Sequence, residues 1–267
     1  MLKDITLGQF FPGKTVVHRL DPRTKLILVI VYIVALFSAK SFVTYGIMLA
    51  TLCGIIAASR ILPKVILRSL KPLLFIICLT GILNLFYTQG EPLVEFWIFT
   101  ITKEGVKSAV FMVLRISMLI VGTFMLTYTT SPIALTDGLE ILLNPLKKIK
   151  VPVHELSMMM CIALRFIPTL IEETDKIMSA QKARGADFET GSLLQRAKAL
   201  IPILVPLFIS SFRRPDELAV AMECRCYHGG EGRTRMKQLH YAARDVVALT
   251  GGFVLLAAVI VLAHFGL

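Results

Sequence analysis

The most regular feature of this sequence is a series of apolar runs separated by short polar segments. A helix needs about 20 apolar residues to cross a bilayer, or somewhat fewer when it is tilted or has polar anchors at its ends. We therefore predict five membrane spans, of which the last two have the clearest pattern: Leu26–Ala39, Phe42–Ser59, Pro72–Tyr87, Val106–Tyr128 and Val246–Phe265. A further apolar run, Leu200–Phe212, is short and contains two prolines, which predicts a buried or interfacial helix.

The long stretch 129–245 between the fourth and fifth spans has a helical pattern, and its helices are amphipathic. Ser131-Pro132 predicts the start of one helix in the manner of an N-cap. A second helix is predicted from Pro168 to a C-cap at Gly185, with acidic and apolar side chains on different faces. An apolar stripe follows from Ser192, and Arg214-Pro215 predicts the start of a further helix.

Two arginine tripeptides lie at the predicted ends of these helices. Ala183-Arg184-Gly185 closes the first amphipathic helix, and Cys224-Arg225-Cys226 closes the second, shortly before Gly229-Gly230. A basic side chain in the last turn also suits the helix dipole. On this pattern alone, a capping cation is the favoured explanation of Arg184. The repetition of the pattern predicts that both helix ends are presented to a binding partner.

The composition identifies a membrane protein and gives its orientation. Hydrophobic residues make up 55% of the 267 residues, and the mean hydropathy is +0.73, which a soluble domain of this length rarely reaches. Lysines and arginines are concentrated in 1–25, 60–71 and 129–245, whereas the intervening loops carry only Lys40, Lys103 and Lys107. The positive-inside rule therefore predicts a cytosolic N-terminus, and the net charge of +11 needs no nucleic-acid partner.

We accordingly predict an all-α integral membrane protein with about five transmembrane helices and a cytosolic or interfacial domain of amphipathic coupling helices. Residues 1–128 would hold the N-terminal cytosolic segment and four spans, 129–245 the coupling domain, and 246–267 the last span. The five scattered cysteines predict reduced thiols and no disulfide framework.

Sequence motifs for catalysis are absent. There is no Gly-x-x-x-x-Gly-Lys-Ser/Thr phosphate-binding loop, so we expect no enzymatic activity and no cofactor in this chain. Cys224-x-Cys226 with His228 is a weak metal pattern, because a closed zinc site needs four ligands. The pair Glu172-Glu173 could be an acid pair of an intramembrane hydrolase, but it lies in the amphipathic stretch without a matching histidine.

Arg115 lies inside the fourth predicted span. A cation in a span is costly, so we expect it to face the interior of the bundle or a polar partner, with Asn84, Tyr87 or a partner protein as candidates. Extension of its side chain toward the lipid headgroups is the alternative.

Several segments resemble a known family over nearly the whole chain. They are His18–Lys25, Thr129–Pro132, Leu164–Pro168 with Ala183–Asp187, and Ala221–Tyr227 with Gly229–Arg235. With these motifs the chain resembles the transmembrane T component of energy-coupling factor transporters, which are ATP-driven importers of vitamins and metal ions in the bacterial cytoplasmic membrane.

The resemblance implies specific partners and sites. Ala183, Arg184 and Gly185, and Cys224, Arg225 and Cys226, would dock into grooves on two related ATPase subunits, which would bind ATP and magnesium. A separate small membrane protein, the S component, would capture the substrate. The cysteines beside Arg225 depart from the family's small residues, Ala and Gly. The runner-up function is a self-contained secondary transporter or channel, which would need a polar pathway and inverted repeats that the spans do not show.

Overall fold

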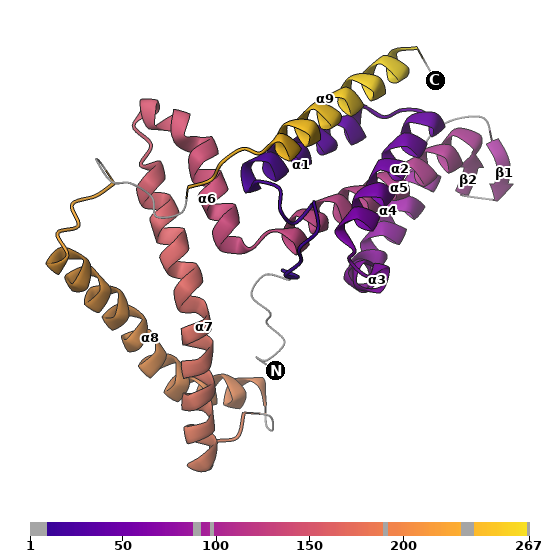
Figure 1. The fold of residues 1–267 in the computed structure, drawn as a ribbon. Helices are drawn as coiled ribbons and strands as arrows, with labels where there is room; N and C mark the ends of the chain where they lie inside the picture. Colours follow the sequence, from indigo (N-terminus) through magenta and orange to yellow (C-terminus); the bar gives the residue numbers. More distant parts are fainter. Residues whose placement is uncertain (1–9, 88–91, 97–98, 189–191, 231–237, 266–267) are drawn as a thin grey trace. The chain divides into compact units, whose positions relative to one another are not determined.

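The computed structural model describes residues 10–87, 92–96, 99–188, 192–230 and 238–265 (Figure 1). Helices dominate the chain, and a short antiparallel hairpin pairs β1 (Pro92–Phe96) with β2 (Phe99–Thr102). The all-α membrane class predicted from the sequence is confirmed. Contacts divide the chain into two units, which we name the bundle unit (Gly8–Leu139 and Leu239–Leu267) and the long-helix unit (Glu140–Gln238).

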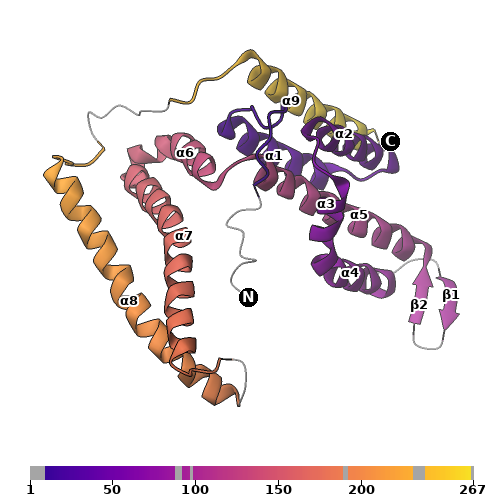
Figure 2. The ribbon, with the colours of Figure 1, turned by 60° about the horizontal axis from the view of Figure 1, so that its bottom comes forward.

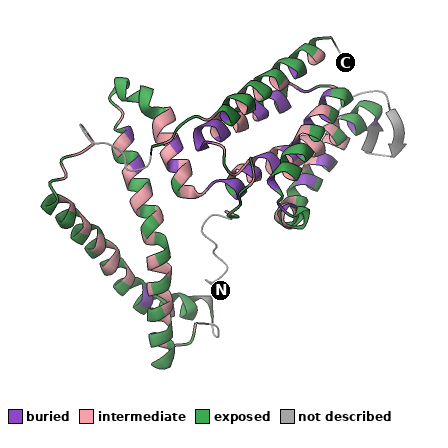
Figure 3. Ribbon diagram, in the orientation of Figure 1, coloured by how far each residue is buried: buried purple, intermediate pink, exposed green. Residues whose placement is uncertain are grey.

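The bundle unit consists of helices that pack around one apolar core. Its main helical contacts are α4 against α5 and α1 against α9 and α5. The core is centred on Leu36, Met48, Met125, Tyr128 and Val259, which are almost fully buried (Figure 3). The helices are α1 (Pro22–Ser38), α2 (Phe42–Ser59), α3 (Pro63–Leu70), η2 (Lys71–Leu73), α4 (Leu74–Tyr87), α5 (Lys103–Thr129) and α9 (Ala243–His264).

The long-helix unit is built on two helices of similar length, α7 (Val153–Ala183) and α8 (Leu193–Cys224). They pack together near the C-terminal end of α7 and diverge from there, as both views show (Figures 1 and 2). The unit begins inside α6 (Pro132–Leu143) and continues through a short 3-10 helix, η3 (Asn144–Ile149). Ser131 Oγ accepts a hydrogen bond from Ala134 N, which confirms the predicted start of α6.

Six helices of the described residues are long and apolar enough to cross a membrane. They include α2, whose bounds match the prediction, together with α5, α9 and the continuous segment Pro63–Tyr87. The other two are α7 and α8, which the prediction treated as amphipathic helices outside the membrane. Helix α1 has 17 residues and falls just short of the same length.

The prolines inside α7 and α8 do not interrupt the helices. Pro168 lies within α7 and Pro215 lies within α8, so the helix starts predicted at these residues were wrong. The short run Leu200–Phe212 is likewise an internal part of α8, which has 32 residues. Around Pro215 side-chain pairs support the helix: Arg213 Nε donates to Glu217 Oε1 at 2.8 Å, and Arg214 Nε donates to Ser210 Oγ at 3.3 Å. An exposed pair of this kind contributes about 0.3 to 0.5 kcal/mol, a small part of the roughly 3 kcal/mol that an internal proline costs.

Candidate functional site

Arg184 is the C-cap residue of α7. The chain then turns through Gly185, which has a φ of +87°. Gly185 N donates to Lys182 O at 3.0 Å, and Ala186 N donates to Gln181 O at 3.0 Å. These two hydrogen bonds define a Schellman motif, which requires a left-handed residue after the cap. The predicted glycine C-cap of this helix is confirmed.

Arg225 holds the same position at the end of α8. Cys226 N donates to Glu223 O at 2.8 Å, and Tyr227 N donates to Met222 O at 3.0 Å, so this end is also a Schellman motif. The left-handed residue here is Cys226, with a φ of +55°. The sequence predicted that this helix runs out at Cys224–Tyr227 before Gly229-Gly230, and α8 does end at Cys224. The residue that takes the left-handed conformation at the cap is Cys226 and not a glycine.

Both tripeptides are accessible to a partner. The exposed residues are Ala183, Arg184, Gly185, Cys224, Arg225 and Cys226. Neither Arg184 nor Arg225 forms an ion pair with any residue that the structure describes. An exposed guanidinium at a helix end offers two parallel donors to a carboxylate of another protein. Chemically, the two ends are suited to recognise acidic side chains.

An ion pair joins the two helices that carry these ends. Arg214 on α8 donates to Glu173 Oε2 on α7 at 2.6 Å, and both side chains are partly buried. Ile203 is buried on α8 as well, while most apolar side chains of that helix are exposed (Figure 3). Glu173, which the sequence offered as part of an acid pair, therefore has a structural partner on α8.

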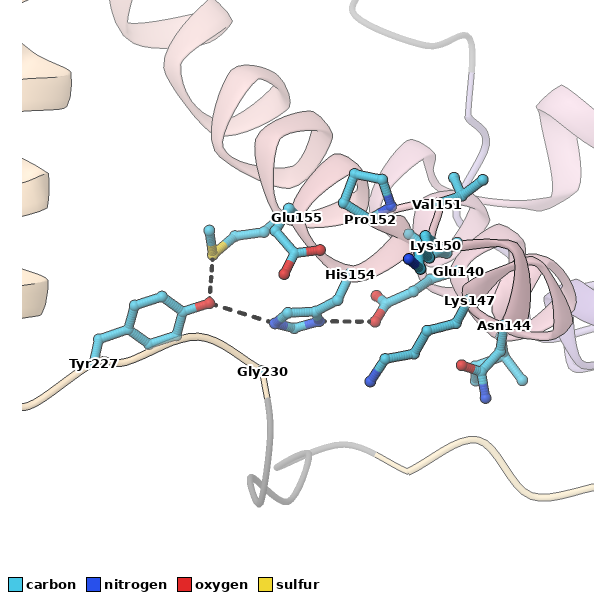
Figure 4. A pocket seen from close by; sticks show the side chains of 13 residues that line it. Glu140, Asn144, Lys147, Lys150, Val151, Pro152, His154, Glu155, Tyr227 and Gly230 are labelled. Atoms are coloured by element: carbon cyan, nitrogen blue, oxygen red, sulfur yellow. Dashed lines mark hydrogen bonds and ion pairs between the residues drawn. The ribbon is translucent and has the colours of Figure 1, made fainter.

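The segment that follows Arg225 returns to the start of α7. His154 Nδ1 is 3.0 Å from Glu140 Oε1 on α6, and its Nε2 is 3.4 Å from the Tyr227 hydroxyl (Figure 4). Tyr227 also donates to Met158 Sδ at 3.1 Å. These residues border a pocket of about 670 Å³ within the long-helix unit. Sequence reasoning missed this group, because no local pattern links residues 73 positions apart.

Arg115 faces the interior of the bundle unit, as expected, but its partners differ from those predicted. Its Nε donates to the Tyr45 hydroxyl at 2.8 Å, and one terminal nitrogen is 3.3 Å from Ala39 O. Asn84 instead donates to Thr80 O on its own helix, and Tyr87 is exposed. The pairing follows from helix packing, since α2 and α5 are in contact.

A buried charged group joins the start of α1 to the start of α9. Asp21 caps α1 and binds the Arg23 guanidinium through both carboxylate oxygens, at 2.9 and 3.0 Å. Asp245 Oδ1 accepts from Asp21 N at 2.7 Å, and its Oδ2 accepts from Ala242 N at 2.9 Å. The sequence marked His18–Lys25 only through the family resemblance, and nothing in it indicated Asp245.

Lys25 links the same region to the end of α5. Its Nζ donates to Thr129 O at 2.8 Å and to Thr130 Oγ1 at 3.1 Å. Partial burial, and then the charge of Lys25, lower the pKa of His18 below its usual value. The segments His18–Lys25 and Thr129–Pro132, far apart in sequence, therefore meet in one place.

The residues that the structure describes contain no group of three or more His, Cys, Asp or Glu side chains placed to hold a metal ion. His228 Nδ1 lies 2.9 Å from Cys226 O, so this histidine contacts the backbone of the turn.

Comparisons with known proteins agree with this architecture. The family described as cobalt transport protein matches residues 13–236. The "Energy-coupling factor transporter transmembrane protein EcfT" of Thermosediminibacter oceani is 55% identical over 247 residues, which cover 92% of this chain and 93% of the relative. The protein of the same name from Acidaminococcus fermentans is 54% identical over 263 residues, covering 98% and 97%. That of Bacillus subtilis is 45% identical over 258 residues, covering 96% and 97%.

These relatives are named as membrane components of transporters, which agrees with a multi-pass, non-catalytic subunit. The chain belongs to the cobalt transport protein family, CbiQ, and groups within it with the transmembrane components of energy-coupling factor transporters.

Proposed function

We propose that this chain is the coupling subunit of an ATP-driven importer. It would transmit the movement of two ATPase subunits to a separate small membrane protein that binds the substrate, a vitamin or a metal ion. The observation that carries this proposal is the equivalence of Arg184 and Arg225. Each is an exposed arginine at the C-cap of a long helix, without an ion-pair partner among the described residues.

The spacing of the two arginines supports two docking partners. A helix rises about 1.5 Å per residue, so α8, with 32 residues, is about 48 Å long. Arg184 precedes the start of α8 by a short connection, and Arg225 directly follows its last residue. Points this far apart suit one groove on each of two ATPase subunits better than a single groove.

The contacts described above would carry the movement. The Arg214–Glu173 pair joins α7 to α8, so a displacement of either arginine end acts on both helices. The boundary between the two units lies within α6, so the chain passes from one unit to the other there. Coupling of this kind needs an element with two states that both sites influence. The two long helices are the candidate for that element, with a cytosolic N-terminus and arginine ends on the cytosolic side.

The test is affinity purification from native membranes in mild detergent, with identification of the bound proteins by mass spectrometry. We expect two related ATPases and small membrane proteins to accompany the wild-type chain. Arg184→Glu and Arg225→Glu should each reduce the ATPase yield, and the double variant should abolish uptake. Lys148→Glu is the matched control, because it makes the same charge change at an exposed residue away from both ends. Normal uptake by the double variant, or substrate transport without ATPases, would overturn the proposal in favour of a self-contained transporter.

A further inference from the structure

The segment immediately after the second arginine is held against another helix. After α8 ends, the chain reverses at Cys226 and brings Tyr227 to the first turn of α7. The Tyr227 hydroxyl contacts His154 Nε2 and donates to Met158 Sδ, and both of these residues belong to α7 (Figure 4). Only the turn residue Cys226 separates Tyr227 from Arg225, so whatever fixes Tyr227 restricts Arg225.

Gly230 adds a second contact to the same histidine. A Cβ placed on Gly230 would lie 2.3 Å from His154 Cδ2 and 2.7 Å from its Nε2. Atoms this close must move apart, so a residue with a side chain at position 230 would displace the imidazole. The chain after α8 therefore meets His154 at two places, through the Tyr227 hydroxyl and through the Gly230 backbone.

The orientation of His154 is itself fixed from a third element. An ionised carboxylate only accepts hydrogen bonds, so Glu140 on α6 selects the imidazole form that carries a proton on Nδ1. The Nε2 atom then points to Tyr227. The Glu140 side chain is 15% exposed and that of His154 is 40% exposed, so this contact is shielded from water on the Glu140 side only.

We propose that the Tyr227–His154–Glu140 contact positions Arg225 for docking. The inference rests on the proposed function and goes beyond it by naming residues that do not touch the ATPase. Helix α8 is otherwise tied to α7 mainly near Ile203 and through Arg214, about ten residues before the docking end. Without the contact at Tyr227, the last turns of α8 would have more orientations, and fewer of them would present Arg225 to its groove.

The experiment measures the affinity of the purified full-length chain for its two ATPase subunits. Tyr227→Phe, which removes one hydroxyl, should weaken binding about threefold to tenfold, the loss expected for one hydrogen bond. A double-mutant cycle gives the decisive comparison. Tyr227→Phe should add little to Arg225→Ala, because the arginine that it positions is already gone. In Arg184→Ala, which changes the other docking end, Tyr227→Phe should weaken ATPase binding by its full factor.

Two variants at His154 distinguish an effect on the orientation of Arg225 from an effect on folding. The amide of His154→Gln can donate to Glu140 and keeps a polar atom that can face the Tyr227 hydroxyl, so this variant should keep most of the affinity. His154→Leu can do neither. Because the Tyr227 hydroxyl keeps Met158 Sδ in that variant, it should weaken binding by no more than Tyr227→Phe does. Affinities are compared only among variants whose melting temperature and monodispersity in detergent match those of the wild-type chain. A variant that does not match is replaced by Gly230→Ala, which displaces His154 without removing a polar group.

The outcomes distinguish the two proposals. If Arg225→Ala weakens binding but Tyr227→Phe does not, the positioning inference is wrong and the docking proposal stands. If Tyr227→Phe weakens ATPase binding by the same factor in Arg184→Ala and in Arg225→Ala, the positioning inference is also wrong. If neither arginine variant changes ATPase binding, the proposed function itself fails.

Discussion

Arg184 and Arg225 occupy the same place in the same turn. In both, the amide two residues after the arginine donates to the carbonyl three residues before it, at 3.0 Å: Ala186 N to Gln181 O and Tyr227 N to Met222 O. The two ends differ in the residue that takes the left-handed conformation, which is Gly185 in one and Cys226 in the other.

This difference predicts that Cys226→Gly stabilises the protein. A side chain in the left-handed region costs about 1 kcal/mol, which glycine avoids, and the larger unfolded-state entropy of glycine offsets part of the gain. We expect a net increase of about 0.5 kcal/mol, seen as a higher melting temperature in detergent. Cys224→Gly is the matched control: this residue is the last of α8, so glycine should lower stability there. A lower melting temperature for Cys226→Gly would contradict the assigned turn.

Replacing either docking arginine by lysine should weaken ATPase binding without abolishing it. Lysine keeps the positive charge but lacks the planar pair of donors that matches a carboxylate. We expect about tenfold weaker binding, equivalent to the loss of one charge-assisted hydrogen bond of about 1.5 kcal/mol. Titration of the purified ATPases against Arg184→Lys and Arg225→Lys measures this. Unchanged affinity would mean that the arginines act only as positive charges.

Reversing one charge of the Arg214–Glu173 pair should impair coupling, and reversing the other charge as well should largely restore it. Glu173→Arg or Arg214→Glu alone places like charges together and should uncouple uptake from ATP hydrolysis. The combined swap should restore much of the coupling, with an interaction energy of about 1 kcal/mol or less for a partly exposed pair. The ratio of substrate transported to ATP hydrolysed is the measurement, and a swap no better than the single variants would show that the pair does not join the helices.

Asp245→Asn should destabilise the bundle unit. The carboxylate is 1% exposed and accepts two backbone hydrogen bonds, whereas an asparagine turns a donor toward one of those amides. We expect a loss of about 2 to 3 kcal/mol, visible as a lower melting temperature and faster proteolysis. Asp216→Asn, at an exposed position in α8, should change stability by about 0.5 kcal/mol or less. Equal effects of the two variants would rule out this role for Asp245.

Local signals in the sequence identified several features that the structure confirms. The bounds of α2 and the helix start at Ser131-Pro132 follow from apolar length and capping chemistry, which act within a few residues. The glycine stop at Gly185 is also local. By contrast, Pro168 and Pro215 misled the prediction, because a helix tolerates an internal proline when its neighbours supply other contacts.

The rest of the candidate site depends on contacts between distant segments. The Asp21–Asp245 contact joins residues 224 positions apart, and the Tyr227–His154 contact joins residues 73 apart. No periodicity in a single sequence encodes such pairs. Arg115 shows the same limit: the cost of its charge predicted a polar environment, but only the packing of α2 on α5 selects Tyr45 and Ala39 over Asn84.

The prolines within α8 have a mechanical consequence. Pro215 cannot donate to the carbonyl of Ser211, so in this turn the resistance of the helix to bending depends partly on the Arg213–Glu217 pair and on Arg214. Those side chains interact by charge, and dissolved salt screens exposed charges. We therefore expect added salt to loosen this turn of α8 slightly, by about 0.5 kcal/mol or less, and to leave the proline-free turns of the same helix unchanged.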